Sequence, residues 1–315
     1  MVIGIPNGLL FCAYREFART FFSALGADVI VSPETNKSIL DAGVRSCEGE
    51  ACLPVKLFCG HAAWLAGRCD AVLAPRLMRV TKRQSVCPMF CGLPELVQKA
   101  VGNVRLIDAP LWALEGRKLR AWAETAAHQA LDHPRHTKSA FDQAVAVQRA
   151  EPAGIRDTGY PHTVALIGHA YNVFDRFVNM NLIRKLHTLG IGVVTHESVD
   201  EAGIEAWMGS LTKKPFWYFA QRYYGAALHL CQCGAVNGII YLSAFGCGVD
   251  SVMSALIRDA AKDYPMMVLK LDEHTGQAGF DTRLEAFADM LQRRTTVGYC
   301  NTEAGEHAYG HAGAV

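Results

Sequence analysis

Segments with the pattern of strands and segments with the pattern of helices alternate along this chain from its first residues. This alternation limits the possible fold more than any other feature of the sequence. Strand-like runs such as Val2–Ile5 and Asp28–Val31 are each followed by apolar residues at helical spacing. The first half is predicted to have strands at 2–5, 28–31, 71–74 and 104–107, and helices at 15–25, 37–43, 55–66 and 93–101. Strand–helix–strand order predicts a mostly parallel sheet with helices on both faces.

The second half has the same alternation. Strands are predicted at 163–167, 192–195, 238–242 and 266–271, and helices at 174–189, 216–233, 249–262 and 282–292. Between the halves, 117–149 predicts a helical hairpin, and the segment 151–161, with its prolines and glycines, predicts a linker. We therefore expect an α/β fold of two Rossmann-like lobes with mostly parallel sheets. The first lobe would take residues 1–155 with the hairpin, the second 156–294, and 295–315 would form a loose tail.

Composition narrows the possible functions. The chain has 315 residues, half of them hydrophobic, which is enough for two packed cores. Its 31 basic and 30 acidic residues are nearly balanced, so we expect neither nucleic acid nor a membrane surface as a partner. No secretory signal and no uncharged stretch of membrane-spanning length is found, which predicts a cytoplasmic protein. No glycine-rich phosphate loop can be matched, so the chain is not expected to hydrolyse ATP.

Eleven cysteines in a cytoplasmic chain indicate metal or redox chemistry rather than a disulfide framework. Cys52, Cys87 and Cys247 lie in loops that lead into predicted helices, the position at which open α/β sheets bind ligands. A helix N-terminus is expected to lower the pKa of a thiol and to stabilise an anionic cluster. We expect these three cysteines to hold an iron–sulfur cluster between the lobes; ordinary buried thiols are the alternative.

The other cysteines fall into two groups. Cys12, Cys47 and Cys91 also lie near loops of this kind, and are ligand candidates on weaker grounds of spacing. The remaining five are expected to be structural: Cys59, Cys69, Cys231, Cys233 and Cys300. Structural zinc sites usually show two close ligand pairs, whereas the best candidates here are far apart, which favours a cluster but leaves zinc as an alternative.

Further polar residues stand at sites suited to catalysis or cluster binding. His61 follows a glycine on the helix after Cys52, although a structural histidine there is as well supported. His169 and Tyr171 follow the first strand of the second half, and Glu273 follows its last strand. These four are the catalytic candidates, since carboxylate and imidazole groups move protons. Gly246, Gly248 and Lys56 are the candidates for contact with the cluster, the glycines by close backbone approach and the lysine by charge.

At these residues the sequence resembles the family of acyl-CoA dehydratase activase-related proteins. That family is akin to the iron–sulfur subunits of 2-hydroxyacyl-CoA dehydratases and benzoyl-CoA reductases and to double-cubane cluster proteins. The resemblance is carried by residues 32–37, 52–57, 60–61, 70–76, 87–94, 168–172, 245–251, 272–275 and 282–287. It implies a 4Fe-4S cluster held by Cys52, Cys87 and Cys247. With Cys12, Cys47 and Cys91 there are six thiolates, the number that an 8Fe-9S double-cubane cluster would need.

The resemblance also implies a function. An oxidoreductase component would receive low-potential electrons from a separate ATP-hydrolysing activator that carries its own iron–sulfur cluster. It would then reduce a small-molecule substrate, of acyl-CoA type by analogy. A non-catalytic cluster carrier or assembly protein, and a zinc-stabilised α/β binding module, are the rival interpretations. The aromatic run at 216–219 predicts either core or the face of a homodimer.

Overall fold

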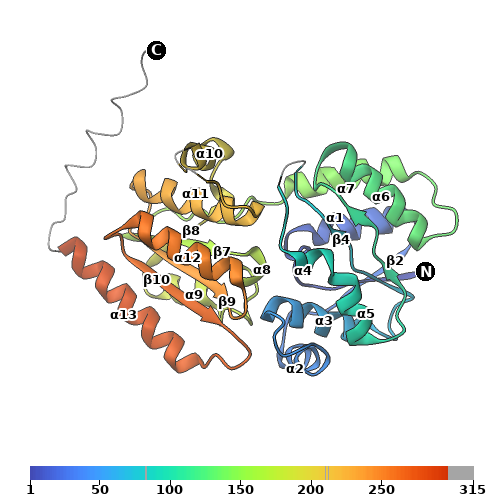
Figure 1. The fold of residues 1–315 in the computed structure, drawn as a ribbon, viewed down its shortest axis with the longest axis horizontal. Coiled ribbons are helices and arrows are strands. Elements are labelled where there is room, and N and C mark those ends of the chain that lie inside the picture. The colour runs from blue at the N-terminus through green and yellow to red at the C-terminus, as the bar shows by residue number, and fades with distance from the viewer. Residues whose placement is uncertain (82–83, 210, 212, 297–315) are drawn as a thin grey trace, which may run out of the picture.

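The computed structural model describes residues 1–81, 84–209, 211 and 213–296, and shows two α/β lobes side by side (Figure 1). The first lobe has a four-stranded sheet in the order β2-β1-β3-β5, and the second has one in the order β10-β9-β7-β8. Both sheets are parallel throughout. Their strands are β1 Val2–Ile5, β2 Asp28–Val31, β3 Ala71–Leu73, β5 Leu106–Ile107, β7 His162–Gly168, β8 Ile191–Thr195, β9 Gly238–Ala244 and β10 Met266–Leu271. The two Rossmann-like lobes predicted from the sequence are confirmed.

Counted within its own lobe, each sheet has its strands in the order 2-1-3-4. The chain therefore reverses direction across the sheet between the first and third strands, β1 and β3 in one lobe and β7 and β9 in the other. Ligand sites of open α/β sheets form at this position, beyond the carboxyl ends of the strands. The loops after these four strands are accordingly the places to look for a site. A separate parallel pair, β4 Arg76–Leu77 with β6 Pro110–Leu111, extends the first lobe.

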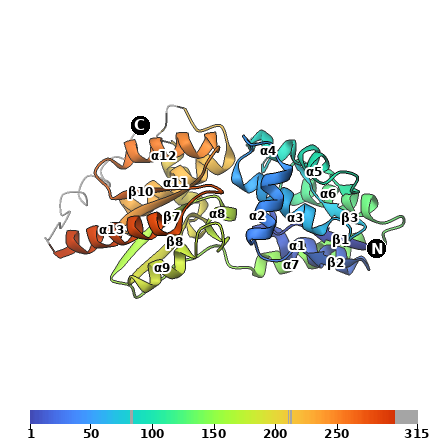
Figure 2. The ribbon, with the colours of Figure 1, turned by 90° about the horizontal axis from the view of Figure 1, so that it is seen from below.

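Helices cover the sheets on both faces (Figure 2). Those of the first lobe are α1 Phe11–Ala24, α2 Lys37–Ser46, α3 Leu53–Leu65, α4 Pro88–Cys91, α5 Leu93–Val101, α6 Gly116–Ala130 and α7 Thr137–Ala150. Those of the second are α8 Ala170–Val173, α9 Leu182–Thr188, a 3₁₀ turn His196–Ser198, α10 Glu201–Gly209, α11 Tyr218–Gln232, α12 Gly248–Ala261 and α13 Gln277–Thr296. Helices α6 and α7 form the predicted hairpin, which lies on the first lobe.

The cores follow from strands that are buried on both faces. All seven residues of β9 are buried, as expected of a central parallel strand. Along β7, Val164 and Leu166 pack into one core with α9 and α13, while Ala165 and Ile167 pack into another with α11 and α12. This alternation is the two-residue period of a strand. No helix in the described part of the chain is long and apolar enough to cross a membrane.

The two lobes also share a core. Leu40 of α2 and two leucines of α3, Leu53 and Leu57, pack into the second lobe's cluster rather than that of their own lobe. Whether 1–155 and 156–294 behave as separate domains stays a prediction. The predicted loose tail falls mostly on residues 297–315, which lie outside the described residues.

The predicted helix at 174–189 is wrong over its first half, because helix α9 begins only at Leu182. In the segment before Leu182, hydrogen bonds between side chains and the backbone replace the backbone hydrogen bonds of a helix. The Asp175 carboxylate accepts from the backbone N–H groups of residues 177 and 178, and the Asn179 amide donates to the carbonyls of residues 172 and 173. Asn181 then has a left-handed backbone conformation, with φ of 58°. Asp and Asn side chains compete with helical hydrogen bonds in this way, which apolar spacing does not reveal.

Candidate metal centre at the lobe interface

The thiols of Cys52, Cys87 and Cys247 occupy equivalent positions in three helices. Each cysteine is the N-cap residue of the helix that follows it: α3, α4 and α12. Proline in the first turn of α3 and of α4 fixes these helix starts, since it needs no N–H donor there. One expectation is corrected: Cys52 does not follow a strand, because the preceding element is helix α2.

Backbone contact brings two of these loops together across the lobes. Gly246 has φ of +80°, and a Cβ atom placed on it would lie 3.5 Å from Cys52 Cα. Gly246 thus closely approaches the Cys52 loop, while its predicted contact with a cluster stays a prediction. Gly248, at the first position of α12, is exposed and has no such neighbour within 4 Å.

Tyr171 is within electrostatic range of all three thiols. Burial raises the pKa of the Tyr171 hydroxyl well above its ordinary value, and negative charge on Asp250, Cys52, Cys247 and Cys87 raises it further. Ligand candidates from both lobes therefore act on the same hydroxyl.

Burial outweighs the expected effect of the helix N-termini on the thiols of Cys52 and Cys247. The pKa of Cys52 is raised to about 11, chiefly by burial. The pKa of Cys247 is also raised, by burial first and by the charge of Asp250 second. Shielded thiols of this kind ionise when a metal cation supplies the compensating charge.

The donor set therefore fits an iron–sulfur cluster held by three cysteines. Asn172, beside Tyr171, has no accessible surface, and neither its Oδ1 nor its Nδ2 has a hydrogen-bond partner among the described residues. A group bound beside Tyr171 could supply such a partner.

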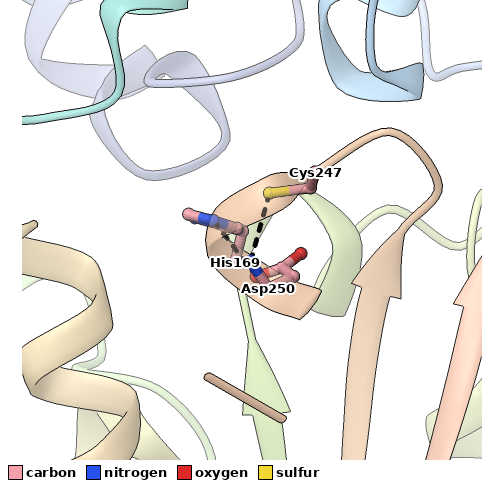
Figure 3. A group of neighbouring side chains, drawn as sticks. All are labelled: His169, Cys247 and Asp250. Atoms are coloured by element: carbon pink, nitrogen blue, oxygen red, sulfur yellow. Dashed lines mark hydrogen bonds and ion pairs between the residues drawn. The ribbon is translucent and has the colours of Figure 1, made fainter. Parts of the chain in front are cut away.

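A second set of potential ligands is centred on Cys247 (Figure 3). His169, Cys247 and Asp250 each offer one ligand atom, and these atoms all lie within 4.8 Å of one another. His169 Nε2 is 3.5 Å from Asp250 Oδ1, and the Asp250 N–H donates to Cys247 Sγ over 3.5 Å. Asp250 is not among the ligand candidates singled out from the sequence. Its position three residues after Cys247 was the available signal.

Neighbouring tyrosines hold this group in place. The Tyr223 hydroxyl lies 2.6 Å from His169 Nδ1, and the Tyr241 hydroxyl donates to Asp250 Oδ1 over 3.0 Å. Burial lowers the pKa of His169. The imidazole is therefore neutral at neutral pH, which is the form that binds metals.

The remaining catalytic and cofactor candidates lie elsewhere in the lobe interface. Lys56 and Glu273 pair with each other across the lobes, with 2.6 Å between Nζ and Oε1. His61, which has no exposed surface, is 2.9 Å from Ser32 Oγ through Nδ1 and 3.1 Å from Thr35 Oγ1 through Nε2. Catalytic roles for Glu273 and His61, and contact of Lys56 with a cluster, stay predictions.

The three weaker ligand candidates have different neighbours. Cys12 lies near Asp175, and burial raises its pKa to about 12. The Cys47 pKa is lowered, mainly by a hydrogen bond with Cys59. Cys91 Sγ lies 3.5 Å from the sulfur of Met78. Cys12, Cys47 and Cys91 therefore each have different neighbouring residues.

These features define a two-lobed α/β protein with a cysteine-rich site at the lobe interface. A family model described as the CoA enzyme activase uncharacterised domain matches residues 2–199, which span the first lobe and the first two strands of the second. The chain belongs to this family. No curated protein is similar enough to the chain to count as a match.

Proposed function

We propose that the chain is an iron–sulfur oxidoreductase component that receives low-potential electrons and reduces a small molecule. A 4Fe-4S cluster would be held by Cys52, Cys87 and Cys247. The observation that carries this proposal is that three cysteines cap helices in two lobes and that Gly246, next to Cys247, closely approaches Cys52 across the lobes. When bound, such a cluster supplies low-potential electrons and an iron without a protein ligand.

The residues around the thiols are suited to hold protons beside that site. Tyr171 keeps the proton on its hydroxyl at neutral pH, because its pKa is raised. Its ring stacks on His169 with 4.7 Å between ring centroids. His169 is oriented by Tyr223 on one side and faces Asp250 on the other. A molecule reduced here would thus meet a fixed hydroxyl donor rather than bulk water.

Anaerobic purification with iron, acid-labile sulfide and zinc analysis tests the proposal. We expect about four iron and four sulfide per chain. Replacing Cys247 with Ser should abolish both, because the second lobe then offers no thiol at the site. Cys231→Ser is the matched control, a half-buried thiol at the end of α11 that should leave the iron content unchanged.

The same measurement distinguishes a double-cubane cluster. About eight iron per chain, lowered by serine at Cys12, Cys47 or Cys91, would support the larger cluster. Unchanged iron in those three variants would support the single cubane. Full iron retention in Cys247→Ser would contradict both arrangements.

A separate ATP-hydrolysing activator with its own cluster is the partner in this proposal, and membership of a CoA enzyme activase family supports it. The chain alone should neither bind nor hydrolyse ATP, since its sequence has no phosphate loop. Calorimetric titration of the cluster-loaded protein with Mg-ATP measures this. Binding in the micromolar range would assign the nucleotide to this chain instead of a partner.

A mononuclear zinc site is the second candidate, favoured by the grouping of His169, Cys247 and Asp250. Mixed nitrogen, sulfur and oxygen donors suit zinc, and the protein would then be a zinc-stabilised binding module. A His169→Ala variant separates the two. A zinc site should lose its metal in that variant, whereas a cluster held by three cysteines should keep its iron.

A further inference from the structure

A cavity of about 300 Å³ lies between the lobes, next to the candidate metal centre. Aromatic side chains from both lobes form much of its wall: Tyr14 and Phe90 from the first, and Tyr171, Tyr218, Phe219 and Tyr223 from the second. The volume is at the lower end of the range for small-molecule binding pockets, which begins at about 300 Å³. At ~30 Å³ per water molecule, it corresponds to about ten waters. A small molecule fits within it.

The polar part of the wall has hydrogen-bonding atoms without partners. Both carboxylate oxygens of Glu197 are shielded from solvent and have no hydrogen-bond partner among the described residues. The same holds for Nδ1 of His196, a side chain that is only 5% exposed. This nitrogen lies 3.3 Å from Glu197 Oε2 without the geometry of a hydrogen bond. The Glu197 carboxylate, which can only accept when ionised, thus has no donor in hydrogen-bond geometry.

Arg222, the cation in this wall, is bonded elsewhere. Its guanidinium donates to the carboxylate of Glu201 and lies 5.8 Å from the centre of the Tyr218 ring. Burial raises the pKa of Glu197, whereas its own backbone N–H, the nearby Thr195 hydroxyl and, last, the charge of Arg222 lower it by less. These groups together therefore do not offset the cost of burying the Glu197 carboxylate.

We propose that this cavity binds a small primary ammonium compound with an apolar body, and that Glu197 is its counter-ion. A primary ammonium carries a positive charge and three N–H donors, which suits a buried carboxylate without a donor in hydrogen-bond geometry. Aromatic ring faces attract cations in desolvated sites. A carboxylate ligand is disfavoured, because it would face the carboxylate of Glu197.

This inference does not depend on the proposed function, although it places its ligand next to the same site. Tyr171 lines the cavity and is within electrostatic range of the three thiols. An amine in the cavity is therefore placed beside the proposed cluster site. Its binding requires only the residues of this chain.

Calorimetric titration of the full chain, purified anaerobically and analysed for iron in the same sample, tests the proposal. The probes are phenethylamine and butylamine, each compared with its neutral alcohol, 2-phenylethanol or butan-1-ol. We expect at least one amine to bind at least tenfold more tightly than its alcohol. Equal binding of each amine and its alcohol, or no binding of either amine, would overturn the inference.

Variants assign the counter-ion. Glu197→Gln should weaken amine binding at least tenfold and leave alcohol binding unchanged. The amine affinity of Glu197→Asp should lie between those of Glu197→Gln and the unaltered protein. Glu205→Gln, at an exposed position of α10, is the matched control and should behave like the unaltered protein. Thermal unfolding of each variant reports whether it is folded. Unchanged amine binding in folded Glu197→Gln would refute the assignment.

Failure of this inference can be told from failure of the proposed function. Cys247→Ser should lose its iron and still bind the amine. Amine binding by a protein that never contains iron would leave the inference standing and remove the cluster. A full iron content without amine binding would support the cluster and overturn the inference about the amine.

Discussion

The hydrogen bonds of His61 have a fixed direction. Thr35 donates its hydroxyl proton to the Asp175 carboxylate, which in its ionised form can only accept. Thr35 Oγ1 must then accept from His61 Nε2–H, so Nδ1 accepts from the Ser32 hydroxyl. A neutral imidazole satisfies every bond in this chain, which joins the first lobe to the second through Asp175.

Protonation of His61 should therefore destabilise the protein. Burial lowers its pKa to about 4, against about 6.5 for an unfolded histidine. Between these values the unfolded chain binds the proton and the folded protein does not. Stability from this source is present above pH 6.5 and is lost as the pH falls to 4, by about 3 kcal/mol.

Denaturant unfolding at pH 7 and pH 4 measures this loss. The free energy of unfolding should fall by about 3 kcal/mol more in the unaltered protein than in His61→Gln, in which the titrating group is gone. Asp175 is present in both proteins, so its own titration cancels to first order. His133→Gln, at an exposed position between α6 and α7, should lose as much free energy of unfolding between pH 7 and pH 4 as the unaltered protein. Equal losses in all three would show that His61 does not titrate as described.

At the scale of elements, two glycines set how closely α2 and α3 pack. A Cβ atom on Gly43 would lie 1.9 Å from the Lys56 carbonyl oxygen, and one on Gly60 would lie 2.1 Å from the Ile39 carbonyl oxygen. Backbone therefore meets backbone at this crossing, with no flexible side chain to give way. Because Cys52 caps α3, the crossing also positions one of the three thiols.

Gly60→Ala should force α2 and α3 apart. We expect the free energy of unfolding to fall by about 3 kcal/mol, at the upper end for overpacking. Iron content should fall with it, because α3 positions Cys52. In Gly279→Ala the new methyl group meets open space within α13, so this control should be slightly more stable, by at most about 1 kcal/mol. A Gly60→Ala variant as stable as the original would contradict the close crossing.

Strand positions were predictable at this scale because buried parallel strands are short apolar runs. β2 and β10 have the predicted bounds. The predicted positions of Cys87 and Cys247 followed from proline or glycine at the helix start. Helix α10 was not predicted, since two glycines interrupt its pattern. The Glu197–His196 cavity wall was missed too, because nothing in the sequence around the 3₁₀ turn reveals which polar atoms lack partners.

At the scale of the molecule, one ion pair is nearly enclosed by the two lobes. Lys56 of α3 is 4% exposed, and Glu273 after β10 is 19% exposed. The lysine, mainly through its hydrogen bond, lowers the pKa of Glu273. The stability that this pair adds is therefore present above the ordinary pKa of a glutamate and is lost at lower pH, as the carboxylate becomes protonated.

Glu273→Gln should leave Lys56 buried without a counter-ion. We expect a loss of about 2–3 kcal/mol in the free energy of unfolding, near the lower end for a broken buried pair since Glu273 is partly exposed. Adding Lys56→Met should recover most of it. Asp41→Asn breaks the exposed pair with Lys37 and should cost less than about 1 kcal/mol. A double variant no more stable than Glu273→Gln would refute the desolvation argument.

How the lobes meet could not be predicted from the sequence. Partners such as Lys56 and Glu273 are 217 residues apart, and each alone is an ordinary polar residue near a loop. The sequence placed both near candidate loops but could not pair them. The shared core is hidden for the same reason, since Leu40, Leu53 and Leu57 read as interior residues of their own lobe.

The origin of the three thiols in two lobes has a consequence for how the protein is made. Cys247 leaves the ribosome 160 residues after Cys87, which at 5–20 residues per second is about 10–30 s later. During that interval Cys52 and Cys87 are present without their third partner, and the leucines of α2 and α3 lack the surface that covers them. Iron delivered to the nascent chain would find an incomplete site. In the proposed function the cluster would therefore be loaded last, after the second lobe has closed onto the first.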